Sequence, residues 1–172
     1  MKTMLCSLLA LLLLPNLLYA QQPPAPEWTY ARYTELAKAT GRKMDVPEAV
    51  FKETQARKEK VLKVIEKYLD GKFKKAQPEV VQAFRDLPRE YFHYNYQQKV
   101  NLVRNAYESD AKPWPIGYGS VLSDYLGQAY MTQLAEPKSS DVVLEIGTGS
   151  GFQIALLSRI VKEAYSIEII EP

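Results

Sequence analysis

One stretch decides the fold of this chain: residues 142–151, Val-Val-Leu-Glu-Ile-Gly-Thr-Gly-Ser-Gly. Its first half is an apolar run typical of a buried strand, and a segment of helical character follows from Phe152. Between them, Gly147, Gly149 and Gly151 can adopt positive φ or let a ligand approach the backbone without a Cβ in the way. A strand, a glycine turn and a helix in this order predict a loop that holds a ligand at the helix N-terminus.

A second strand-like run, Ala164-Tyr165-Ser166-Ile167, ends at Glu168, which lies 17 residues beyond Gly151. An acidic residue at this place accepts hydrogen bonds from the hydroxyls of a ribose. Strand, glycine turn, helix, strand and acid therefore predict a nucleoside site in an α/β, Rossmann-like fold. The alternative is a strand-to-helix turn in which the glycines serve packing alone.

The glycine spacing argues against a dinucleotide. The dinucleotide pattern G-x-G-x-x-G would place its third glycine at position 152, where this chain has Phe152. Residues 145–151, Glu-Ile-Gly-Thr-Gly-Ser-Gly, instead resemble the first motif of the class I S-adenosylmethionine-dependent methyltransferases. The resemblance implies S-adenosyl-L-methionine as the cofactor, a ligand without a pyrophosphate.

Segments upstream of the loop make the resemblance more specific. Residues 87–92 read Leu-Pro-Arg-Glu-Tyr-Phe and residues 115–119 read Pro-Ile-Gly-Tyr-Gly, and Ser123, Met131 and Leu134 follow. In order and spacing, the chain from about Pro78 to its end is similar to the protein-L-isoaspartate O-methyltransferase family. The resemblance implies methylation of the α-carboxylate of L-isoaspartyl residues in damaged proteins, after which the ester recloses to a succinimide.

The same resemblance implies roles for individual residues. Ser123 matches the active-site serine of the family. The other matched positions lie around the cofactor or beside the substrate: Ser120, Val121, Leu122, Gln128, Glu145, Gly147, Gly149, Ser150, Gly151, Glu168 and Ile169. The alternative for Ser123 is a helix N-cap ahead of a helix over residues 124–135.

Methyl transfer to a carboxylate places few demands on side-chain chemistry. The acceptor is already ionised at neutral pH, so the displacement at the sulfonium carbon requires neither a general base nor a metal. Holding the two reactants in line is what lowers the barrier.

The chain departs from the family around the serine. The family typically has Thr-Ile-Ser-Gln-Pro or Thr-Ile-Ser-Ala-Pro, whereas residues 121–125 are Val-Leu-Ser-Asp-Tyr. The charge of Asp124 opposes the binding of a carboxylate substrate unless a cation intervenes. Two alternatives therefore stay open, namely a methyltransferase with another acceptor and a non-catalytic binding or interaction protein on the same scaffold.

Residues 1–20 form a different kind of signal. Lys2 precedes an apolar run, and Gln21 begins a polar, proline-containing stretch, a pattern that predicts a secretory signal peptide cleaved after Ala20. The run is short and interrupted by Pro15, so we expect no stable membrane insertion after cleavage. An exported protein is the expectation and a cytoplasmic one the alternative. Cys6 is the only cysteine, so the mature chain would have no disulfides.

Composition limits the other functions. The formal net charge of +2 gives no strong electrostatic argument for a nucleic-acid partner. His93 is the only histidine, and with Cys6 removed a zinc site is not expected. The four aromatic residues within residues 91–96 are typical of a packing element, and we expect His93 to belong to it rather than to act as a base.

Residues 21–77 are predicted to form a helical extension ahead of a methyltransferase part at 78–172. We expect a short helix over 28–39 and a long amphipathic helix capped by Asp45, with Glu48 completing a capping box and Gly71 at its end. The eleven Lys or Arg and six Asp or Glu between residues 42 and 75 alternate in sign, which favours a solvated helix face over a nucleic-acid or membrane patch. A third helix is expected from Pro78 to about Leu87.

The methyltransferase part supplies few strands. A doubly wound sheet of this class has about seven, and residues 142–167 provide the first two, which would leave an unpaired edge and an uncovered apolar face. We therefore expect the fold to be truncated after its second sheet strand and the chain to be part of a longer protein.

Overall fold

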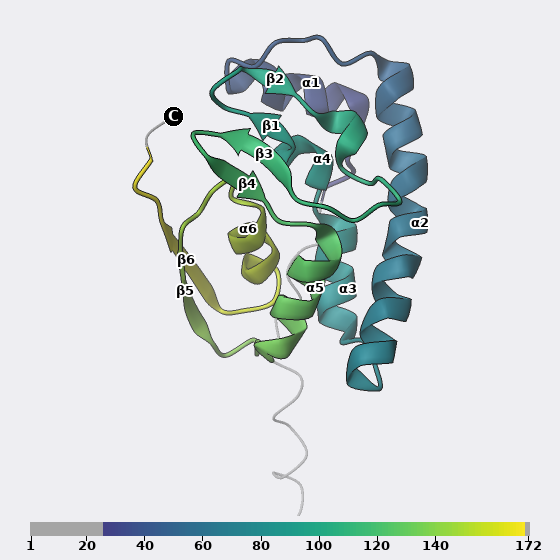
Figure 1. The fold of residues 1–172 in the computed structure, drawn as a ribbon, viewed down its shortest axis with the longest axis vertical. Helices are drawn as coiled ribbons and strands as arrows, with labels where there is room; N and C mark the ends of the chain where they lie inside the picture. Colours follow the sequence, from purple (N-terminus) through teal and green to yellow (C-terminus); the bar gives the residue numbers. More distant parts are fainter. Residues whose placement is uncertain (1–25, 171–172) are drawn as a thin grey trace, which may run out of the picture.

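The computed structural model describes residues 26–170, so the predicted signal peptide lies outside the described residues. A long helix, α2 (Glu48–Phe73), runs along one side of the fold. Two strands, β5 (Val142–Ile146) and β6 (Glu163–Ile167), lie on the opposite side, and shorter helices fill the space between them (Figure 1). Among residues 26–170, no helix combines the length and the apolar character needed to cross a bilayer.

The first helix, α1 (Tyr30–Ala39), confirms the helix predicted near residues 28–39, and the side chain of Thr29 caps it. The caps predicted for α2 are wrong. The N-cap of α2 is Pro47, without a side-chain cap bond, because Asp45 instead accepts a hydrogen bond from Asn101 Nδ2 at 2.7 Å. The Asp45 carboxylate, which the local pattern assigned to the helix cap, therefore binds Asn101, a residue far away in the sequence.

The predicted end of α2 at Gly71 is also wrong. The helix continues to Phe73, and Lys74 rather than Gly71 has the positive φ at its end, 67°. The ring of Phe73 packs on that of Tyr130 with their centroids 5.1 Å apart. The contact between these two rings favours continuation of the helix past Gly71, which the local sequence does not predict.

Helix α3 (Pro78–Asp86) lies where the sequence predicts it and ends before Pro88. Its buried residues, Val80, Ala83 and Phe84, join the main hydrophobic core together with the inner face of α2. A single turn of helix, α4 (Arg89–Phe92), follows directly.

Two small antiparallel hairpins follow α4. The first pairs β1 (Tyr94–Asn95) with β2 (Val100–Asn101), and a 3₁₀ turn, η1 (Val103–Asn105), comes next. The second pairs β3 (Trp114–Gly117) with β4 (Ser120–Leu122) through a turn in which three successive residues have positive φ. The second hairpin delivers the chain to the helix that forms one wall of the site.

That helix, α5 (Tyr125–Leu134), corrects one alternative from the sequence. Its N-cap is Asp124, whose Oδ1 accepts a hydrogen bond from the backbone N–H of Gly127 at 2.8 Å. Ser123 is therefore not the cap. The carboxylate of Asp124 is a suitable partner for the unpaired N–H groups and the positive end of the dipole at a helix start.

The predicted strand, glycine turn, helix and strand are all present. Strands β5 and β6 pair in parallel, with Val142 opposite Glu163 and Ile146 opposite Ile167, and α6 (Phe152–Ser158) connects them. Phe152 and Leu156 of α6 are buried. Leu144 and Ile146 of β5 are 60% and 79% exposed, because no other element in the described part of the chain covers their face of the two-stranded sheet. The uncovered apolar face expected from the sequence is thus present.

A buried carboxylate ties the N-terminal helices to this part of the fold. Glu90 of α4 accepts hydrogen bonds from Trp28 Nε1 at 2.6 Å, from Gln55 Nε2 at 2.5 Å and from the Tyr107 hydroxyl at 2.7 Å. Its side chain is fully buried. Four distant segments of the chain therefore meet at a single carboxylate.

Replacement of Glu90 with alanine is expected to destabilise the fold by about 3 kcal/mol or more, because three donors would lose their acceptor inside the protein. Urea denaturation measures the free energy of unfolding. The control is Glu66→Ala, which changes an exposed glutamate on α2. Equal stability of the two variants would contradict a structural role for Glu90.

Candidate functional site

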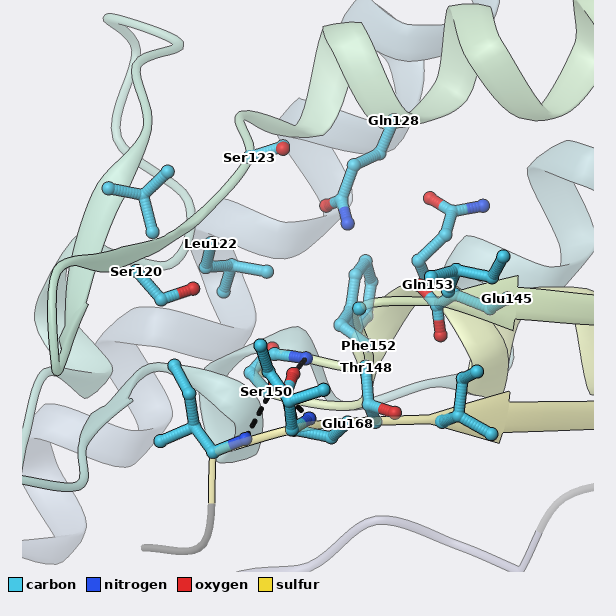
Figure 2. A pocket seen from close by; sticks show the side chains of 17 residues that line it. Ser120, Leu122, Ser123, Gln128, Glu145, Thr148, Ser150, Phe152, Gln153 and Glu168 are labelled. Carbon is cyan, nitrogen blue, oxygen red and sulfur yellow. Dashed lines mark hydrogen bonds between the residues drawn. The ribbon is translucent and has the colours of Figure 1, made fainter.

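A cleft of ≈ 380 Å³ lies between the glycine turn, the end of β6 and the junction of β4 with α5. Figure 2 shows Ser123 and Gln128 on the α5 side, facing Glu145, Thr148 and Glu168 across the open space. Of the residues predicted for the site, all except Gly151 line the cleft: Ser120, Val121, Leu122, Ser123, Gln128, Glu145, Gly147, Gly149, Ser150, Glu168 and Ile169.

The glycine turn has the backbone conformation that its sequence predicts. The φ angles of Gly147, Gly149 and Gly151 are 89°, 54° and 84°, a region that other residues rarely adopt. Gly151 is the N-cap of α6 and shapes the turn without lining the cleft. A Cβ on Gly149 would lie 3.5 Å from Ile116 Cδ1, so the loop also approaches the β3–β4 hairpin closely at this point.

Glu168 lies directly after β6 at the exposed rim of the cleft. Its Oε2 accepts a hydrogen bond from the Gly149 N–H at 2.8 Å, and its Oε1 accepts from the N–H groups of Ile169 and Ile170. These backbone donors, Gly149 first, lower the pKa of the Glu168 carboxyl. The carboxylate is therefore ionised at neutral pH and is held against the glycine turn.

A chain of hydroxyl groups orients the second acid of the cleft. The Ser166 hydroxyl donates to Glu145 Oε2 at 2.9 Å and lies 2.5 Å from the Thr148 hydroxyl. Because the Ser166 proton points to Glu145, Thr148 is the donor in the second bond. Burial raises the pKa of Glu145, and the Ser166 hydrogen bond partly opposes that rise.

The α5 wall presents two polar groups to the cleft. Ser123 is exposed, and its hydroxyl is not used to cap α5, because Asp124 does so. Gln128, one turn into the helix, is buried at the back of the cleft. Val121 and Ile169 stand at the mouth, where both are largely exposed.

Sequence reasoning missed several residues of the site. Thr148, Phe152 and Gln153 line the cleft. Their position within or just after the glycine motif could have indicated that they belong to the site. The amide of Gln153 is held by the Thr132 hydroxyl, which accepts its hydrogen bond at 2.9 Å. The ring of Phe152 is fully buried beneath the cleft and packs against Phe84 and Phe92.

Arg89 was also missed as part of the site, although it belongs to the segment 87–92. Its Nη2 donates to the Ser123 carbonyl at 2.6 Å, and its Nη1 donates to Oε1 of Gln128. The guanidinium group therefore lies directly behind the α5 wall. No local sequence pattern indicates a contact between residues so far apart in the chain.

A second, more apolar cleft of ≈ 330 Å³ adjoins the first. Tyr96, Ile116 and Tyr118 of the hairpin region line it together with the glycine turn and Glu168. The Ser150 hydroxyl, which borders both clefts, is buried without a hydrogen-bond partner among residues 26–170. An unsatisfied hydroxyl at this place provides a polar group for a ligand.

His93 lies outside both clefts. It is buried, and neither ring nitrogen has a hydrogen-bond partner within the described part of the chain. Burial and the neighbouring charge of Arg89 keep the pKa of His93 well below its usual value. On either side of it in the sequence, the rings of Tyr91 and Phe92 contact each other, as do those of Tyr94 and Tyr96, so this segment is the packing element predicted from its sequence.

Comparison with known proteins identifies the surrounding scaffold. The family model described as Protein-L-isoaspartate(D-aspartate) O-methyltransferase matches residues 56–172. A protein-L-isoaspartate O-methyltransferase of Opitutus terrae is 47% identical over 90 residues, which are 52% of this chain and 36% of that protein. A protein-L-isoaspartate O-methyltransferase 1 of Nitrosospira multiformis is 57% identical over 60 residues, 35% of this chain and 25% of that protein.

A solved structure named protein-L-isoaspartate O-methyltransferase shares the fold. The two structures superimpose with a TM-score of 0.51 at 24% sequence identity. The matched region is 66% of this chain and 34% of the chain in that structure. The chain thus spans about a third of the length of the curated relatives and of this structure. Because the family model matches more than half of the chain, the chain belongs to the protein-L-isoaspartate(D-aspartate) O-methyltransferase family.

Proposed function

We propose that the protein uses S-adenosyl-L-methionine to methylate the α-carboxylate of L-isoaspartyl residues in damaged proteins. One observation carries this proposal: residues from two separate stretches of the sequence, within 120–128 and within 145–170, line the same cleft. Each group contains the positions that match the family motifs. A common cleft is what a reaction between a bound cofactor and a second substrate needs.

The residues of the β5–β6 side suit a nucleoside cofactor. Glu168 offers a carboxylate to the ribose, the glycine turn allows close approach of the ligand, and Ser150 has an unused hydroxyl. The acid Glu145 lies deeper in the cleft, where the hydroxyl chain from Thr148 orients it. When bound, the cofactor supplies a methyl group on a sulfonium sulfur. These residues bind and orient it.

The residues of the α5 side suit the acceptor. The Ser123 hydroxyl and the Gln128 amide can both donate hydrogen bonds to a carboxylate. Leu122 and Phe152, both buried, limit the access of water to this part of the cleft. The acceptor carboxylate is an ionised nucleophile, so the protein has only to position and desolvate it.

The presence of Asp124 does not by itself favour a non-catalytic protein. Its carboxylate is occupied as the N-cap of α5, where it accepts the Gly127 N–H. The departure from the family pattern at this position thus has a structural explanation. The alternatives of another acceptor or of binding without turnover are distinguished by the assay below.

Transfer of a tritiated methyl group to an isoaspartyl peptide tests the function in the protein expressed from its own gene. We expect Ser123→Ala to lower kcat/KM about tenfold or more, since a hydrogen bond to a charged acceptor would be lost. Ser140→Ala, in the exposed turn after α5, serves as the control. Cofactor binding without any transfer by the unmodified protein would exclude isoaspartyl methylation.

Replacement of Glu168 with alanine tests the cofactor side. We expect S-adenosylmethionine to bind about tenfold or more weakly by calorimetric titration, because charge-assisted hydrogen bonds to the ribose are lost. Glu163→Ala changes an acid at the other end of the same strand, outside the cleft, and should leave the affinity unchanged. If both variants bind like the unmodified protein, the nucleoside site is assigned wrongly.

We propose further that the protein is exported and that residues 1–20 are removed. The support is the sequence of this segment, a basic residue followed by a short apolar run. N-terminal sequencing of the natively expressed protein should find Gln21 at or near the start, in a fraction outside the cytoplasm. An intact leader on cytoplasmic protein would contradict export.

A further inference from the structure

Arg89 carries a buried charge on which the carboxylate of Asp124 acts without forming an ion pair. Its side chain is 1% exposed, and it forms no ion pair with an acidic side chain among residues 26–170. Its Nε has no hydrogen-bond partner in the same part of the chain, and its Cζ lies 4.9 Å from the centre of the Phe152 ring. Burial lowers the pKa of Arg89 from its usual value to about 10, so the group still carries its charge at neutral pH.

A buried, unpaired cation is a poor source of stability. Removing a charge from water costs free energy that only a close counter-charge and good hydrogen bonds repay, and apolar side chains of similar volume often serve a protein core as well. The two hydrogen bonds that its guanidinium group donates both go to the α5 wall of the cleft, at Ser123 and Gln128, whereas its backbone N–H donates to the Tyr107 hydroxyl. The Arg89 charge therefore acts directly on the polar groups of the α5 wall.

The bond to Gln128 fixes the direction of its amide. Guanidinium groups only donate hydrogen bonds, so the amide oxygen of Gln128 has to face Arg89. The amide NH₂ is then turned away from Arg89, and Gln128 lines the cleft. A side chain that could present either end to a ligand is thereby held with its donor toward the cleft.

We propose that Arg89 is a positioning residue that makes the α5 wall attractive to the carboxylate of the methyl acceptor. It orients the Gln128 donor, holds the backbone of Ser123, and supplies a positive charge that offsets Asp124 on the same wall. Because Arg89 and Gln128 are themselves buried, this charge is less screened by water than a surface charge would be. The inference rests on the proposed function, since it concerns the acceptor of that reaction.

Two peptides and three variants test the proposal in the protein expressed from its own gene. The peptides carry the same isoaspartyl residue, with its α-carboxylate free or converted to the amide. The variants are Arg89→Met, which removes the charge and keeps the apolar bulk, Arg89→Lys, which keeps the charge, and Asp124→Asn, which removes a negative charge but retains a good N-cap residue. Binding of each peptide and of S-adenosylmethionine is measured separately.

Arg89→Met is expected to weaken binding of the free carboxylate about tenfold or more and to leave the amide and the cofactor nearly unchanged. Arg89→Lys should restore part of the preference for the carboxylate, and Asp124→Asn should increase it. Equal weakening of both peptides by Arg89→Met would show a merely structural role. A loss confined to the cofactor would show that Arg89 serves the cofactor's carboxylate instead. Either result overturns the proposal.

If Arg89→Met does not fold, the Asp124→Asn variant decides, because its cap is preserved. An unchanged ratio between the two peptides would then overturn the proposal. A wrong assignment of the methyl acceptor would give a different result. If the unmodified protein binds neither peptide, the isoaspartyl acceptor is wrong and this inference falls with it, whereas equal binding of both peptides by the unmodified protein contradicts only the role of Arg89.

Discussion

The buried carboxylate of Glu90 on α4 is the group on which the packing of the helical part depends, and its neighbour Arg89 reaches the functional site. Glu90 gathers donors from the N-terminal segment, from α2 and from Tyr107, whereas Arg89 donates to the wall of the cleft. The single turn of α4, which begins just after Pro88, points the two side chains toward different partners. Neither side chain forms an ion pair with the other, and the hydrogen-bond partners of each come from elsewhere in the chain. The placement of the site therefore depends on the helical part of the fold.

The β5–α6–β6 unit has a different physical basis. Its glycine turn is stabilised locally, by positive φ at three glycines and by the backbone N–H of Gly149 bound to Glu168. This carboxylate fastens the turn to the end of β6, so one residue that suits a ribose also shapes the loop that would surround the ligand. The unit contains the residues that we propose for the cofactor. Without the α5 wall it has no place for a second substrate.

The N-caps that the local sequence suggested for α2 and α5 are both wrong. Asp45 and Ser123 were both suited to cap a helix, yet Asp45 binds Asn101 and Asp124 is the cap of α5. At α5 two neighbouring side chains were suited to cap the helix and Asp124 does so, whereas the start of α2 has no side-chain cap because Asp45 has another partner. The outcome at Asp124 matters for function, because a carboxylate occupied by a helix N-terminus repels an anionic substrate less than a free one.

From the sequence alone, the β5–α6–β6 unit, the helix α3 and the glycine turn could be predicted. Those features follow from apolar periodicity and from glycines whose conformation is a local property. The packing of the whole chain was needed to show that residues within 120–128 share a cleft with the glycine turn, that Arg89 lies behind them, and that the Gln128 oxygen accepts a hydrogen bond from Arg89. These arrangements join residues tens of positions apart. They depend on how the helices pack, which no local pattern encodes.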